Sequence, residues 1–83
     1  MISLKDTAAL MDSEDYKVRL KAEYWQVRLR YNQLIRFVYN PHKNKDLTEE
    51  QKELMSKQAL YMYHYMLCLA DRCKMEGVDV HEE

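Results

Sequence analysis

The residues whose side chains are best suited to bind a ligand lie along one stripe of the segment 13–39. They are basic, amide and aromatic side chains spaced four, three, four and four residues apart, which places them on one face of a helix. The members are Lys21, Trp25, Arg28, Asn32 and Arg36. Arginine forks bind phosphate and aromatic rings stack on bases, so the stripe indicates an anionic ligand that carries a base. Tyr31, beside Arg28 and Arg30, is the best placed ring for stacking on such a ligand.

The same stripe has a second interpretation, as a solvated face whose cations are paired with acids. Between Lys17 and Lys45 the chain has eight basic residues and a single acid, Glu23. Most of the other acids gather at the expected helix starts and in the C-terminal tail. Those close enough in a folded hairpin to pair with the stripe are Glu49, Glu50 and Glu53. The sequence leaves both interpretations open.

Metal binding and catalysis find little support in the sequence. His64 and Cys68 are four residues apart and share a helix face, as two zinc ligands would. Cys73 points away from both, because it is five residues beyond Cys68. We therefore expect no metal and no cofactor. Gly-rich phosphate loops, nucleophile elbows and Cys–His signatures are absent, so we expect that the protein is not an enzyme.

Composition predicts one all-α domain over residues 1–83. The chain has one Gly and one Pro, too few for the turns of a β protein, and its net charge is −1. That charge argues against nucleic acid as a partner. The first residues lack the pattern of a signal peptide, and no apolar run reaches the roughly 20 residues that span a bilayer. We expect a cytoplasmic protein with free thiols and no membrane partner.

Helical segments joined by short loops are predicted to position the stripe. They are a short N-terminal helix or arm (1–11), helix one (13–39), helix two (48–76) and a flexible tail (78–83). Ser3 and Thr48 are suited to cap helix N-termini. Pro41 ends helix one and Gly77 ends helix two. A short loop between two long helices predicts an antiparallel hairpin.

The hairpin is predicted to close along two apolar seams with the spacing of a coiled coil. The helix-one seam is Leu20, Tyr24, Val27, Tyr31, Leu34 and Val38. The helix-two seam is Met55, Ala59, Met62, Met66, Leu69 and Cys73. These residues account for one apolar side of each helix.

Each long helix also carries a second apolar surface that the hairpin leaves uncovered. On helix one it is Val18, Ala22, Trp25 and Leu29, and on helix two it is Leu54, Tyr61, Tyr65 and Cys68. The arm 1–11 is long enough to cover one of these surfaces but not both. We therefore expect a homo-oligomer, a dimer or higher helical bundle, with the helix-two residues in its interface.

Several short segments of the two long helices carry a family resemblance. In helix one these segments are Ser13–Lys17, Lys21–Gln26 and Arg30-Tyr31. In helix two they are Gln58, Tyr65, Leu67, Arg72 and Glu76–Val78. Together they resemble small phage and prophage proteins labelled as related to a crAss-like phage protein, and the match spans most of residues 13–78. The resemblance implies a phage accessory protein made in a bacterial host cell, and it implies no active site.

Three functions fit these observations. The first is sequestration of an anionic nucleotide signal of host defence, in pockets between subunits that the Arg/Tyr/Trp stripe lines. The second is inhibition of a host defence protein by direct binding, as anti-CRISPR proteins do. The third is a structural or assembly role in the phage itself.

Overall fold

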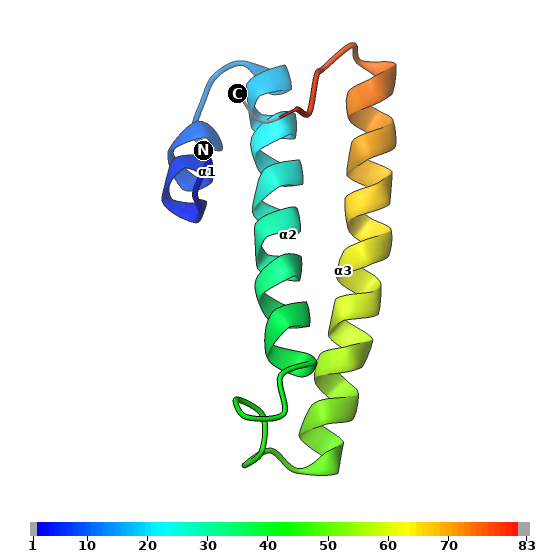
Figure 1. Ribbon diagram of the computed structural model, residues 1–83. Coiled ribbons are helices and arrows are strands. Elements are labelled where there is room, and N and C mark those ends of the chain that lie inside the picture. The colour runs from blue at the N-terminus through cyan, green and yellow to red at the C-terminus, as the bar shows by residue number, and fades with distance from the viewer. Residues whose placement is uncertain (1, 82–83) are drawn as a thin grey trace.

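The protein is all-α, as a computed structural model that describes residues 2–81 shows (Figure 1). Its helices are α1 (Leu4–Leu10), α2 (Tyr16–Val38) and α3 (Glu49–Met75). Helices α2 and α3 lie side by side and run in opposite directions, which confirms the predicted hairpin. No helix within residues 2–81 is long and apolar enough to cross a membrane. Residue 1 of the predicted arm and residues 82–83 of the predicted tail lie outside the described residues.

Reciprocal hydrogen bonds begin α1 and α3 at the predicted caps. The Ser3 hydroxyl accepts from the Asp6 N–H at 3.2 Å, and the Asp6 carboxylate accepts from the Ser3 N–H at 3.0 Å. Thr48 and Gln51 form the same capping box at the start of α3. Helix α2 begins later than expected because Asp15 is its cap, with its carboxylate accepting from the Lys17 N–H at 2.9 Å.

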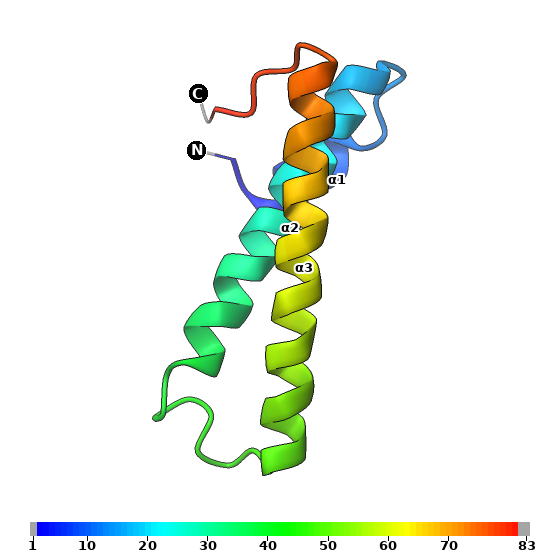
Figure 2. The ribbon, with the colours of Figure 1, turned by 90° about the vertical axis from the view of Figure 1, so that its right-hand side faces the viewer.

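The seam between α2 and α3 is tightest near the chain ends. There Leu20, Tyr24 and Val27 of α2 are buried against Leu69 and Cys73 of α3. Toward the loop the seam residues Tyr31, Leu34, Val38, Met55 and Met62 are only half-buried. In Figure 2 the two helices separate toward the loop, whereas in Figure 1 they approach each other in that direction, so they pack at an angle. Apart from the buried Ala59, the seam is therefore less deeply buried toward the loop than near the termini.

The second apolar surface of α2 is covered by the chain's own ends. Helix α1 packs on α2, on the side away from α3 (Figure 1). Trp25 of that surface is 5% exposed, and Thr7 on α1 is fully buried. After Gly77, whose φ of +68° turns the chain back, Val78 and Val80 also pack against the core. Val78 and Val80 of the predicted flexible tail thus contribute to the core.

The second apolar surface of α3 stays uncovered in the single chain. Leu54 is 60% exposed and Tyr61 is 61% exposed, and Tyr65 and Cys68 are exposed as well. The prediction that one chain has more apolar helical surface than it can cover therefore holds for α3. It does not hold for α2, because α1 and the tail cover that helix.

Leu69→Ala is expected to lower the free energy of unfolding by about 2–5 kcal/mol, because Leu69 is 1% exposed and its removal leaves a cavity. Leu60→Ala is the matched control, since Leu60 lies on the same helix and is 53% exposed. Urea denaturation followed by circular dichroism at one protein concentration measures both. Equal losses in the two variants would contradict the burial described above.

Acid is expected to release α1 from α2. The hydrogen bonds from the Ser3 backbone and side chain lower the pKa of Asp6, so the stabilisation from this carboxylate is present at neutral pH. This stabilisation is lost as the pH falls below the ordinary pKa of an aspartate side chain. Trp25 is the only tryptophan, so its fluorescence should shift to longer wavelength as its cover loosens. In Ser3→Ala the shift should begin at higher pH, and an unchanged profile would contradict the role of the cap.

Candidate ligand-binding site

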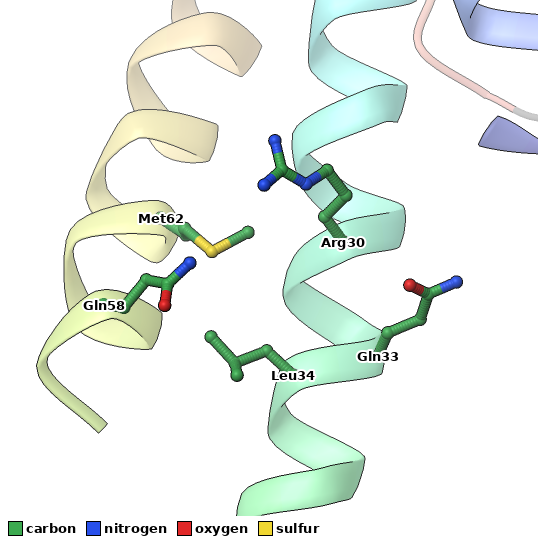
Figure 3. Close-up of a pocket in the computed structure, with 5 residues that line it drawn as sticks. All are labelled: Arg30, Gln33, Leu34, Gln58 and Met62. Atoms are coloured by element: carbon green, nitrogen blue, oxygen red, sulfur yellow. The ribbon is translucent and has the colours of Figure 1, made fainter. Parts of the chain in front are cut away.

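A groove of about 290 Å³ lies between α2 and α3, in the half of the hairpin nearer the loop. Figure 3 shows Leu34 of α2 and Met62 and Gln58 of α3 pointing toward one another across it. Arg30 reaches toward the same gap, and Gln33 lies on the outer side of α2. The groove therefore combines an apolar floor with one cation and two amides. We call it the Arg30 groove.

A second hollow of about 290 Å³ continues along α2 toward the loop. It is lined by Gln33, Arg36, Phe37 and Lys43. Gln33 lines both hollows, so they adjoin. We call the two together the basic trough. Its lining contains three cations and no acid, so its electrostatic potential favours anions.

The cations of α2 are not neutralised by the acids of α3. Within residues 2–81, the ion pair closer than 4.0 Å joins two neighbours on α3, Lys52 and Glu49, at 3.5 Å. Arg19 donates instead to the Ser13 carbonyl at 2.8 Å, and Arg36 donates through Nε to the Asn32 carbonyl at 3.3 Å. The structure therefore does not support the interpretation that acids of α3 pair with the basic residues of α2.

The predicted stripe is divided between core and surface. Trp25 lies in the core, and the Arg28 guanidinium stacks over its ring at 4.9 Å from the centroid. Arg28 also donates to the Tyr24 hydroxyl at 3.1 Å. The indole nitrogen Nε1 of Trp25 is buried with no hydrogen-bond partner among the described residues. Trp25 and Arg28 thus support the packing of α2 in the single chain and offer a ligand little open surface.

The remaining stripe residues lie at the surface in separate places. Lys21 is half-buried, Asn32 is exposed, and Arg36 lines the basic trough. Tyr31 lies 5.9 Å from Tyr63, ring centroid to ring centroid. This pair belongs to a third hollow of about 250 Å³. Its lining residues are Tyr31, Ile35, Tyr39, Ser56, Ala59, Leu60 and Tyr63. Helical spacing puts this tyrosine groove on the opposite flank of the seam from the Arg30 groove.

The sequence analysis did not assign Gln33, Gln58 or Arg30 to the ligand-binding site, although Gln58 and Arg30 belong to the segments that carry the family resemblance. One signal was present, since Arg30, Gln33 and Arg36 recur at intervals of three on one side of α2. The spacing alone does not show which side of α2 stays open. That depends on where α1 docks.

The cysteines and histidines form no centre of their own. His64 and Cys68 are both exposed on α3, and the described residues contain no group of three metal-ligating side chains. Burial raises the pKa of the Cys73 thiol, which keeps it protonated and unreactive. Cys73 is thus a small apolar side chain of the core.

Residues 14–75, more than half of the chain, match the protein family described as Sequestin. The matched stretch contains all of α2 and α3, and with them the basic trough. Helix α1 and the tail that follows Gly77 lie outside it. No curated protein and no solved structure matches the chain.

Proposed function

The chain belongs to the Sequestin family, and from this premise we propose that it binds a signal molecule stoichiometrically, without catalysis, and so withdraws it from a host defence system. The proposed setting is a phage accessory protein in the bacterial cytoplasm. The family's name denotes sequestration and specifies no ligand. We propose an anionic nucleotide, and the basic trough is the observation that carries this choice.

The trough offers each part of a nucleotide a suitable partner. Arg30, Arg36 and Lys43 supply cations for phosphate oxygens, and arginine forks bind phosphate through two hydrogen bonds. The amides of Gln33 and Gln58 each present a donor and an acceptor, which suits the edge of a base. The apolar floor beside them accepts the face of a ring. Cations spread over two adjoining hollows favour a ligand with more than one phosphate.

One chain alone covers such a ligand poorly. Each hollow, at about 290 Å³, is near the lower limit of pockets that enclose a small molecule. Gln58, in the wall of the Arg30 groove, is four residues from Leu54 and seven from Tyr65, so the groove borders the exposed apolar surface of α3. A second subunit on that surface would deepen the groove. This supports a pocket between subunits of a homo-oligomer.

A panel of cyclic and linear nucleotides tests the proposal by thermal unfolding. At least one nucleotide should raise the Tm, because a ligand that binds only the folded protein stabilises it. Arg30→Glu should abolish that rise by placing a negative charge in the groove. Lys17→Glu makes the same change of charge at an exposed position outside the trough and should keep it. A Tm that no nucleotide changes, or an unchanged rise in Arg30→Glu, would rule out the trough as the site.

The exposed α3 surface favours a second candidate, direct inhibition of a host defence protein. Tyrosines are enriched at protein interfaces because they join an apolar body to a polar tip, and Tyr61 and Tyr65 are both exposed. For this function, Tyr61→Glu should abolish co-purification with one host protein while Arg30→Glu retains it. For nucleotide sequestration, neither variant should co-purify with a host protein, and Arg30→Glu should lose the nucleotide. Affinity purification from host lysate, paired with nucleotide titration, separates the two functions.

A further inference from the structure

The exposed apolar surface of α3 is part of a longer row with symmetric spacing. From its first to its last member the row advances by four, three, four, four, three and four residues, so the spacing reads the same in both directions about Tyr61. Its members are Glu50, Leu54, Lys57, Tyr61, Tyr65, Cys68 and Arg72. All seven are exposed in the single chain. We call them the α3 row.

We propose that a second copy of this chain docks on the α3 row, with the two α3 helices antiparallel and Tyr61 at the two-fold axis. In this register Glu50 meets Arg72 of the partner subunit, and Leu54 meets Cys68 of the partner subunit. Lys57 meets Tyr65 of the partner subunit, and the two Tyr61 rings face each other. Each pair is chemically matched, as charge with charge, apolar with apolar, and cation with aromatic ring.

Charge selects the antiparallel orientation over the parallel one. Helix α3 has Glu49 and Glu50 in its first turn and Arg72 and Lys74 in its last turn. An antiparallel pair sets the acidic end of one helix against the basic end of the other, and it also opposes the two helix dipoles. A parallel pair would bring like charges together at both ends.

Two members of the row are already held near these positions. The Arg72 guanidinium donates to the Tyr16 hydroxyl of α2 at 2.8 Å, which limits the freedom of its side chain. The Lys57 ammonium lies 6.0 Å from the centroid of the Tyr61 ring. Docking would place the ring of the partner subunit's Tyr65 against the same ammonium group. Less side-chain entropy is lost where a group is held in advance.

The other flank of α3 provides a comparison within the same helix. Leu60, Tyr63 and Leu67 are also exposed there, at intervals of three and four. This flank is shorter, and Tyr63 is already engaged with Tyr31. It therefore serves as the matched control surface. The proposed contact rests on the α3 row alone, whereas the pocket it would deepen rests on the proposed nucleotide function.

Leu54→Cys in the full chain tests the register by disulfide formation under mild oxidation. The new thiol should bond to Cys68 of the partner subunit and give a covalent dimer on a non-reducing gel. Adding Cys68→Ser should abolish that dimer. Leu60→Cys should give little of it. The wild-type protein should also give little covalent dimer through Cys68, because the two Cys68 residues of the dimer lie about 20 Å apart along antiparallel helices in this register.

Reversal of the terminal charges provides a second measurement by light scattering. Glu50→Arg should raise the Kd of the dimer roughly tenfold, since it affects both symmetric pairs. Adding Arg72→Glu should restore the wild-type value. A wild-type protein that is monomeric at every concentration, or a rapid Cys68–Cys68 bond, would overturn the proposal.

The outcomes separate this contact from the nucleotide function. Cross-linking of Leu54→Cys without any nucleotide effect on Tm would support the contact and reject the ligand. A nucleotide-stabilised protein that stays monomeric and does not cross-link would reject the contact and leave the ligand in place.

Discussion

The structure depends on a difference in burial between the two long helices. Helix α1 and the tail cover the outer face of α2, whereas the outer face of α3 is exposed to solvent. Trp25 is at the centre of this arrangement. It is enclosed in the part of the core where Ile2, Val78 and Val80 pack, and Arg28 lies over its ring. A helix with apolar residues on several sides requires cover on each of them. With α1 and the tail packed against α2, most of the exposed large apolar side chains lie on α3.

Burial also differs between the two ends of the hairpin. The end near the termini has the tight core of Leu20, Leu69 and Cys73. The end near the loop has half-buried seam residues, the grooves, and cations of α2 that form no ion pair within residues 2–81. Stability therefore comes mainly from one half, and the other half is left with surface that can recognise a ligand. The division allows changes in the basic trough with little loss of core packing.

The position of the acids explains why the trough remains basic. Glu49 and Glu50 lie in the first turn of α3, where they interact favourably with the helix dipole, and in the described part of the chain no acid of α3 forms an ion pair with an arginine of α2. In the proposed dimer one of them, Glu50, would meet a cation of the second copy. The same arrangement would thus leave positive charge free for a ligand and bring two copies together in a single orientation.

The amino-acid sequence is sufficient to predict the helices, their caps at Ser3 and Thr48, the seam of the hairpin and the surplus of apolar helical surface. These features follow from local spacing and from side chains that bond to nearby backbone. The three-dimensional arrangement, by contrast, places α1 against α2, makes Trp25 a core residue and brings Arg30 and Gln58 to one groove. Spacing places residues on a face of a helix, but packing between distant segments determines which face remains exposed to solvent. The predicted stripe was therefore divided, although each residue lies on the helix where the sequence put it.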